Sequence, residues 1–354
     1  MDIYLAPMEG ITTYVFRNAF AKYYGGVDKY FTPFLTASHL KGREEREVRP
    51  ENNQGINLVP QILANDADSF ITIARQLVDR GYSEINLNLG CPSGTVVSKK
   101  RGAGVLGDPK LLDELLYGIF EKAENLKISV KTRIGMEFLS EWDDVLEVYK
   151  KYPIYELIIH PRLRNEFYSG EVHVDEFMKA ANVLCINEEK HPKDVDAKTP
   201  ALNIGTTRRT TSICYNGDII DLESFDRING LINKNHSSDE EEYIPIMIGR
   251  GILMNPSLPQ NIKNATNDSL GTFESDHNRL VNSDKNTLRA FLDEIAENYI
   301  DEMSHEKQVV MKMKELWTYL AKGLELDKKT LRELLKVNKL SEYKNVLQMI
   351  FSQI

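Results

Sequence analysis

The sequence predicts an α/β protein, a closed (β/α)8 TIM barrel followed by a small all-α helical bundle. Short apolar, β-branched segments recur eight times between residues 3 and 248, with helical patterns between them. Polar or glycine-containing residues follow nearly every one of these segments. Parallel barrel strands bring their carboxyl ends to one face, where active sites are built, so this pattern favours a barrel over an open sheet.

Eight strands are predicted in chain order from these apolar segments. They span residues 3–7, 29–35, 57–63, 84–89, 127–132, 155–160, 211–215 and 244–248. Helical patterns lie between them, for example over residues 67–80 and 109–124. In the first of these, one buried face is expected to contain Phe70, Ile73, Ala74, Leu77 and Val78.

The chain divides into a barrel domain, residues 1–260, a linker, residues 261–285, and a helical domain, residues 286–354. Residues 187–209 are polar and read as an insertion in the barrel. Two amphipathic helices of the last domain are marked by apolar residues, namely Leu288, Phe291, Leu292, Ile295, Tyr299 and Ile300, then Val310, Met313, Trp317, Leu320 and Leu324. Residues 331–337 and 343–351 suggest two more, which completes a bundle.

The composition is that of an ordinary globular protein, with 42% hydrophobic and 27% charged residues. No secretory signal and no apolar run long enough for a bilayer are visible, so we expect a cytoplasmic protein without membrane contact. We take it to be a monomer. Cys91, Cys185 and Cys214 are widely spaced, which argues against disulfides and structural zinc, and the histidines are not at ligand spacing, so no metal is expected.

The net charge of −9 weakens a broad attraction to RNA, yet the segment from Lys285 onward is nearly balanced. A local basic surface therefore remains compatible with the composition. The run Lys99-Lys100-Arg101 either guides RNA phosphates or is a solvated loop, and its charge alone favours neither.

The segment INLNLGCP places Cys91 in a glycine/proline turn at the end of the predicted fourth strand. A lone cysteine is most often a small buried apolar residue. Its neighbours change that reading. Between Leu5 and Gly251 the chain contains, in order, LAPMEG, NLNLGCP with the GA that follows it, VKTRIG, IIHPRL, YNGD and MIGRG.

Together these motifs resemble the tRNA-dihydrouridine synthases of bacterial type, and MKELWTYL in the tail is similar to their helical tRNA-binding domain. Two residues depart from the family pattern. Asn86 stands where an Asp is common, and Pro161 where a Gly is common after the His. Neither touches the reacting groups in the family scheme.

The resemblance implies a flavoprotein that reduces the C5–C6 double bond of a D-loop uridine in tRNA to 5,6-dihydrouridine. FMN would take electrons from NADPH (or NADH) and pass hydride from N5 to C6, while Cys91 as catalytic acid protonates C5 from the opposite face. A thiol with a reference pKa of about 8.5 is largely protonated at neutral pH and suits that role.

The resemblance also implies the contacts of each ligand. FMN would contact Pro7, Met8 and Glu9 along the ring edge, Gln61 and Lys131 at the ring, His160, and Asn216, Gly217, Asp218, Gly249 and Arg250 around the phosphate. The RNA would contact Asn88, Arg133, His160, Tyr168 as a stacking partner, and Lys314 in the tail. The alternatives are an ordinary strand-end lysine for Lys131 and a core histidine for His160. The Trp317 stripe is expected to be core rather than a base-stacking platform.

Two other functions remain open. One is an FMN barrel oxidoreductase acting on a free small-molecule pyrimidine or enone, for which a helical tail and the cysteine would be unnecessary. The other is an RNA-binding protein that keeps the barrel without catalysis. That reading predicts lost flavin or acid residues, and the sequence retains them.

Overall fold

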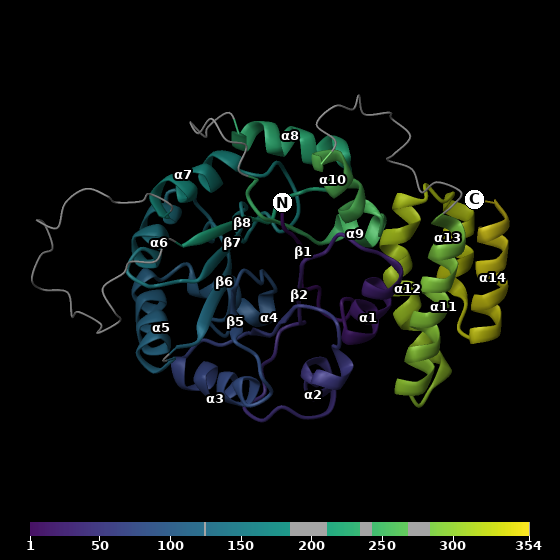
Figure 1. The fold of residues 1–354 in the computed structure, drawn as a ribbon, viewed down its shortest axis with the longest axis horizontal. Helices are drawn as coiled ribbons and strands as arrows, with labels where there is room; N and C mark the ends of the chain where they lie inside the picture. The colour runs from purple at the N-terminus through teal and green to yellow at the C-terminus, as the bar shows by residue number, and fades with distance from the viewer. Residues whose placement is uncertain (124, 185–210, 234–242, 268–283, 354) are drawn as a thin grey trace, which may run out of the picture.

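The barrel predicted from the sequence is present in the structure, a computed structural model that describes residues 1–123, 125–184, 211–233, 243–267 and 284–353. Its strands form one parallel sheet in the order β3-β2-β1-β9-β8-β7-β6-β5-β4, and the helices surround it (Figure 1). The strands are β1 (Ile3–Leu5), β2 (Lys29–Phe31), β3 (Leu58–Val59), β4 (Gln61–Ile62), β5 (Glu84–Leu89), β6 (Lys127–Arg133), β7 (Glu156–His160), β8 (Ser212–Tyr215) and β9 (Ile246–Ile248).

Pro60 divides the predicted third strand into β3 and β4, which are the two ends of the sheet. Proline has no N–H, so a strand cannot pass through it without losing a ladder hydrogen bond. The gap is nevertheless bridged. The Pro60 carbonyl accepts from the Asn86 amide at 2.9 Å, and the Gln61 amide donates to Thr32 Oγ1 at 2.9 Å. The eight predicted units thus give nine strands in a nearly closed barrel.

The helices of the barrel domain mostly cover the outside of the sheet (Figure 1). They are α1 (Tyr14–Tyr23), α2 (Gly42–Val48), α3 (Ala67–Val78), α4 (Gly94–Val97), α5 (Pro109–Lys122), α6 (Glu141–Tyr149), α7 (Val174–Leu184), α8 (Leu222–Asn233), α9 (Arg250–Met254) and α10 (Leu258–Asn267), with 3-10 turns η1 (Pro50–Asn52) and η2 (Gly102–Val105). The predicted buried face of α3 is confirmed except at Val78, which is 47% exposed at the end of the helix.

Side chains fill the barrel in layers of different chemistry. The middle layer is apolar and consists of Tyr4, Ala6, Phe31, Val59, Ile158, Cys214 and Met247. Burial raises the pKa of Cys214 well above its ordinary value, so this thiol stays neutral and serves as core. Polar and charged side chains lie on both sides of this layer, and those at the carboxyl ends of the strands build the candidate site.

The four predicted tail helices are present as α11 (Asp284–Glu302), α12 (Glu306–Gly323), α13 (Lys328–Lys336) and α14 (Leu340–Gln353). Trp317 is fully buried and its indole N–H donates to Tyr343 Oη at 3.0 Å, which confirms its core role. Ile300 was expected on the buried face of α11 but is 41% exposed, because the buried residues of this helix lie on a different face from Ile300. No described helix is long and apolar enough to span a bilayer.

The predicted linker begins as a helix rather than a loop. Residues 261–267 belong to α10, where Ile262 enters the core and Lys263 pairs with Asp28. The rest of that linker up to residue 283, and the predicted insertion at 187–209, lie outside the described residues.

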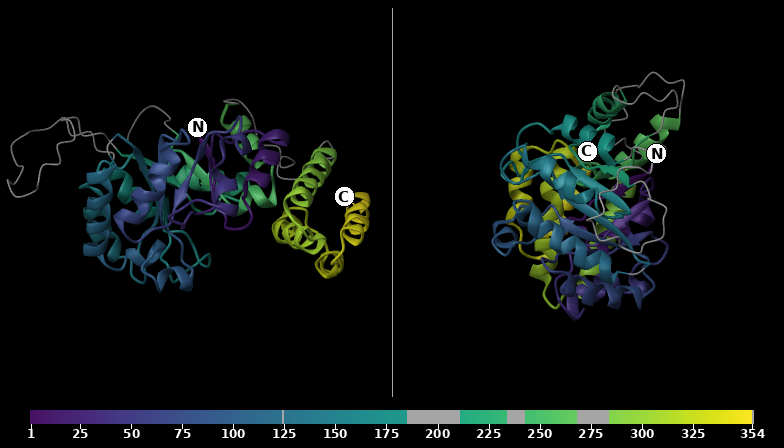
Figure 2. Two further views of the ribbon diagram at one scale, coloured as in Figure 1. Left: turned by 90° about the horizontal axis from the view of Figure 1, so that it is seen from below. Right: turned by 90° about the vertical axis from the view of Figure 1, so that its left-hand side faces the viewer.

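The tail docks on the barrel through two helix contacts, and the bundle extends from one end of the molecule (Figure 2). Phe291 of α11 meets the rings of Phe16 and Tyr24 edge-on, with centroids 5.6 and 5.3 Å apart. Gly323 at the end of α12 lies so close to α9 that an added Cβ would be 1.9 Å from the Met254 carbonyl oxygen. Barrel and tail therefore share one hydrophobic core.

Candidate active site

The carboxyl ends of the strands bring most of the predicted site residues to one face, called here the barrel mouth. Cys91 follows β5, Lys131 and Arg133 lie in β6, and His160 ends β7. The phosphate-loop candidates follow the last two strands, with Asn216, Gly217 and Asp218 after β8, and Gly249 and Arg250 after β9. This convergence is what a parallel barrel imposes on residues that follow its strands.

The Cys91 turn is held by the side chain of Asn88. Its Oδ1 accepts hydrogen bonds from the amides of Gly90 and Cys91, both at 3.0 Å. On the other side, the Ala103 amide donates to the Cys91 carbonyl at 3.1 Å. Gly102 has φ +54°, and an added Cβ would lie 2.8 Å from that carbonyl, so this position requires glycine. Cys91 is half-buried in this turn.

A row of amides fixes the floor beneath the cysteine. Asn88 donates to Gln61 Oε1 at 2.7 Å, Gln61 donates to Asn86 Oδ1 at 2.8 Å, and Asn86 donates to Ser129 Oγ at 3.0 Å. Asn86 both accepts and donates here, which a carboxylate could not do. The departure from the family pattern at Asn86 therefore has a structural use in this chain.

Four cations gather at the mouth, namely Lys131, Arg133, Arg162 and Arg250. Burial, aided by Arg133, lowers the pKa of Lys131 to about 8. Within the described chain, Lys131 makes no hydrogen bond or ion pair. The mouth is thus locally electropositive although the chain carries a net charge of −9.

His160 is neutral at this site. Burial lowers its pKa well below the ordinary value, and the neighbouring Arg133, Lys131, Arg162 and Arg250 lower it further. Arg162 Nη1 lies 3.4 Å from His160 Nε2. Because a guanidinium can only donate, the contact favours the tautomer with its hydrogen on Nδ1.

Arg133 and Arg162 both fasten the loop that follows β7. Arg133 donates to the carbonyls of Gly90 at 3.1 Å, Leu163 at 2.9 Å and Phe167 at 2.7 Å. Burial lowers the pKa of its guanidinium to about 10. Arg162, which sequence reasoning did not assign to the site, donates to the Ser169 carbonyl at 3.2 Å. The sequence feature that could have identified Arg162 is its position two residues after the strand-end histidine, His160.

The carboxylate of Asp218 links Arg162, which follows β7, to Arg250, which follows β9. It receives two hydrogen bonds from Arg162, at 3.0 and 2.8 Å, and forms an ion pair with Arg250. These arginines lower the pKa of Asp218 even though burial opposes them. Its side chain therefore orients Arg250, while its main chain remains available for the predicted phosphate loop.

Tyr168 covers the mouth from the loop after β7 and is 55% exposed. Its ring lies 5.0 Å from the Arg250 guanidinium and 5.5 Å from that of Arg133, and it stacks on His160 with centroids 6.0 Å apart. Tyr319 of α12, which the sequence did not indicate, lies close to Tyr168. Burial raises the pKa of Tyr319, and the neighbouring Tyr168 raises it further. The tail thus reaches the edge of the site.

The remaining predicted residues lie at different distances from this centre. Met8 borders Gly249, whose added Cβ would be 3.5 Å from Met8 Sδ, and Pro7 is the preceding residue. Glu9 points outward and pairs with Arg43. Lys314 is half-buried on α12 near Glu342, whereas Lys312 reaches the barrel and donates to the Gly10 carbonyl at 2.9 Å.

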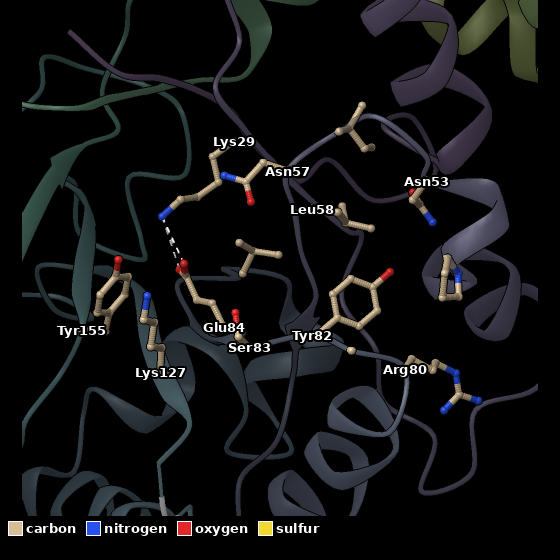
Figure 3. A pocket seen from close by; sticks show the side chains of 14 residues that line it. Lys29, Asn53, Asn57, Leu58, Arg80, Tyr82, Ser83, Glu84, Lys127 and Tyr155 are labelled. Atoms are coloured by element: carbon tan, nitrogen blue, oxygen red, sulfur yellow. Dashed lines mark hydrogen bonds and ion pairs between the residues drawn. The ribbon is translucent and has the colours of Figure 1, made fainter.

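A cavity of about 430 Å³ opens at the opposite end of the barrel, where the strands begin (Figure 3). Lys29 reaches toward Glu84 there, with Tyr155 and Lys127 beside it. Lys29 Nζ lies 3.2 Å from Glu84 Oε2 and 3.0 Å from Glu156 Oε2. None of the predicted site residues lines this cavity, and residues at this end of a barrel usually stabilise the fold.

Within the described residues, no group of three or more His, Cys, Asp or Glu could hold a metal ion. The mouth instead combines a half-exposed thiol, an unpaired ammonium, a neutral imidazole and an exposed aromatic ring. This arrangement suits an anionic cofactor together with a planar substrate.

Comparison with known proteins identifies the family of this chain. Residues 4–183 match the family model for dihydrouridine synthase. The probable tRNA-dihydrouridine synthase of Staphylococcus epidermidis (strain ATCC 12228) is 31% identical over 256 residues, 71% of this chain and 69% of that protein. Probable tRNA-dihydrouridine synthase 2 of Bacillus subtilis (strain 168) is 31% identical over 258 residues, with the same coverage of both chains. The chain belongs to the dihydrouridine synthase family, a family of oxidoreductases.

Proposed function

We propose that this protein is a tRNA-dihydrouridine synthase that reduces the C5–C6 double bond of a D-loop uridine in tRNA to 5,6-dihydrouridine. FMN is the proposed cofactor, and NADPH (or NADH) is the proposed reductant. The protein would act in the cytoplasm as a monomer. The observation that carries the proposal is Cys91, held half-exposed at the barrel mouth near the Lys131 ammonium, which makes no hydrogen bond or ion pair among the described residues. The names of the relatives support tRNA as the substrate.

The residues at the mouth fit FMN. Lys131, Arg133, Arg162 and Arg250 outnumber the single carboxylate of Asp218 among them, so an anionic group is favoured there. The Tyr215 hydroxyl is buried without a hydrogen-bond partner in the described chain, beside the Gly217 loop, and can donate to a bound oxygen. Asn216, Gly217, Gly249 and Arg250 would hold the phosphate, and Pro7, Met8, Gln61 and Lys131 the ring system.

Reduced FMN supplies the hydride when it is bound. The chain supplies the proton and the orientation of the base. The Cys91 thiol gives its proton to C5 of the uracil, and the Asn88 side chain fixes the backbone of that cysteine. Neutral His160 offers its Nδ1–H to an oxygen of the pyrimidine or to a flanking phosphate. Tyr168 replaces the stacking that the uridine loses when it leaves the RNA.

The decisive experiment measures dihydrouridine on an unmodified tRNA transcript with FMN-loaded protein and NADPH. Cys91→Ala should bind FMN and accept electrons from NADPH at the wild-type rate, while dihydrouridine formation falls by roughly 10²- to 10⁴-fold, the usual contribution of a general acid. Cys214→Ala is the matched control. That thiol is buried in the barrel core, so its loss should lower stability and leave turnover intact.

Full activity of Cys91→Ala would remove the acid assignment. Wild-type activity on free uridine or a small enone, without activity on tRNA, would favour the small-molecule oxidoreductase. Tight tRNA binding without flavin and without reduction would favour the non-catalytic RNA-binding protein.

A further inference from the structure

Two loops at the barrel mouth carry a group of exposed apolar side chains. Of the eleven large hydrophobic residues that are exposed in the described chain, four lie in the loops after β6 and β7. They are Phe138 (64% exposed), Leu139 (39%), Phe167 (44%) and Tyr168 (55%). Single exposed hydrophobic residues are ordinary, but a group of them beside a reaction site marks a binding surface.

The two loops form one continuous surface. The Arg164 amide donates to the Gly135 carbonyl at 2.9 Å, and the Asn165 amide donates to the Met136 carbonyl at 3.1 Å. Phe138 and Phe167 therefore project from neighbouring segments whose backbones are fixed to each other. The name stacking surface is used below for these two rings.

Phe167 is held outward by several contacts. Its φ is +51°, a conformation that bulky residues rarely adopt, and its carbonyl accepts from Arg133 Nη2 at 2.7 Å. The Arg164 guanidinium lies 5.3 Å from the centre of its ring and also donates to the Pro92 carbonyl at 3.2 Å. Strained backbone is kept where surrounding contacts over-determine it, often at binding sites. The ring is thus fixed next to the Cys91 turn.

The charges around the stacking surface suit a polyanion. Arg164 lies under the Phe167 ring, and Lys99 and Lys100 are exposed on the loop that follows Cys91. Glu137 is the neighbour of Phe138 and adds a negative charge, so stacking rather than net charge must carry the contact at that position. Aromatic rings interleaved with arginine and lysine are the usual means of binding unpaired nucleotides.

We propose that Phe138 and Phe167 stack on the unpaired bases that flank the target uridine when it enters the barrel mouth. This inference rests on the proposed function and adds a contact outside the reacting centre. A uridine that leaves the base stack exposes a face of each neighbour, and an aromatic ring can cover such a face whatever the base. The surface would therefore tighten RNA binding without reading sequence.

The test compares Phe138→Ala and Phe167→Ala with Phe138→Trp and Phe167→Trp in the full FMN-loaded protein. Each alanine variant should weaken binding of an unmodified tRNA transcript by about fivefold or more, and the tryptophan variants should restore it. Reduction of the flavin by NADPH should stay at the wild-type rate in all four. Tyr117→Ala is the matched control, since Tyr117 is 41% exposed on α5, away from the strand ends.

Wild-type affinity in both alanine variants would overturn the proposal, as would full rescue by leucine, which packs but cannot stack. Failure of the proposed function gives a different result. If the wild type makes no dihydrouridine but its tRNA affinity still depends on Phe138 and Phe167, the stacking surface stands and the activity does not.

Discussion

At the residue scale, Lys131 should make FMN binding at the proposed site sensitive to pH. Burial and Arg133 lower its pKa to about 8, so its charge is present below that pH and is lost above it. If this ammonium holds the anionic cofactor, the affinity of the apoprotein for FMN should fall as pH rises through about 8. Lys131→Met should bind FMN more weakly than the wild type at pH 7, and its affinity should not fall as pH rises. In Lys131→Arg the fall in FMN affinity should occur at a higher pH.

Fluorescence titration of apoprotein with FMN between pH 6.5 and 9.5 measures this directly. An affinity that is constant over the whole range in the wild type would show that the Lys131 charge does not contribute to FMN binding.

The sequence indicated which side chains lie at the mouth better than it indicated their hydrogen-bond partners. Resemblance supplied Asn88 and Arg133 as ligand contacts, but their side chains also hold the Cys91 turn and the loop after β7. Such long-range contacts depend on which strands are neighbours, and spacing along the chain does not contain that information. Arg162 was not assigned for the same reason, since its partner Asp218 is 56 residues away.

At the scale of elements, strand positions could be predicted and strand ends could not. The range of β5 agrees with the apolar pattern, because that strand pairs along its full length with β6. β1 and β2 end earlier than predicted, since apolar residues continue into the loops that follow them, whereas β9 begins two residues later than predicted, after Pro245. The division at Pro60 follows from the missing N–H, a feature that hydrophobicity alone does not reveal.

A buried charge cluster joins the amino ends of three strands. Lys29 of β2 contacts Glu84 of β5 and Glu156 of β7, and Tyr4 Oη donates to Glu156 at 2.8 Å. Lys29→Met should lower the free energy of unfolding by about 3–5 kcal/mol at pH 7, because it leaves a buried carboxylate without its cation. Urea denaturation measures the loss.

The loss should also depend on pH. Burial already raises the pKa of Glu156, and removal of Lys29 raises it further. A carboxyl group whose folded pKa is raised gains a proton on folding, so the variant should lose less stability at pH 5 than at pH 7. Lys29→Met combined with Glu156→Gln should recover part of the loss. Equal losses at both pH values, with no recovery, would contradict this account.

At the scale of the whole molecule, the barrel and the tail should unfold together. Periodicity in the sequence predicted the fold class and the helical tail. It could not predict that α11 docks on α1, because the same amphipathic pattern also fits a bundle that is separate from the barrel. Phe291 is fully buried at that contact, so Phe291→Ala should cost about 3–5 kcal/mol and lower both transitions.

Each part contains one fully buried tryptophan, Trp142 in α6 and Trp317 in α12, which permits a direct measurement. In Trp142→Phe and Trp317→Phe proteins, the remaining fluorophore reports one part alone. Their urea midpoints should coincide, with and without Phe291→Ala, after correction for each tryptophan substitution. A shift confined to the Trp317 signal would mean that the two parts unfold independently.

The close approach of Gly323 to Met254 has a consequence for how a large substrate is measured. α12 ends directly against α9, and α9 begins with Arg250 of the mouth, so the bundle packs on a helix that carries part of the candidate site. If tRNA is the substrate and the bundle binds it, the distance from the bundle to Cys91 would be fixed by this packing. The nucleotide that reaches Cys91 would then be chosen by its distance from the part of the RNA that contacts the bundle.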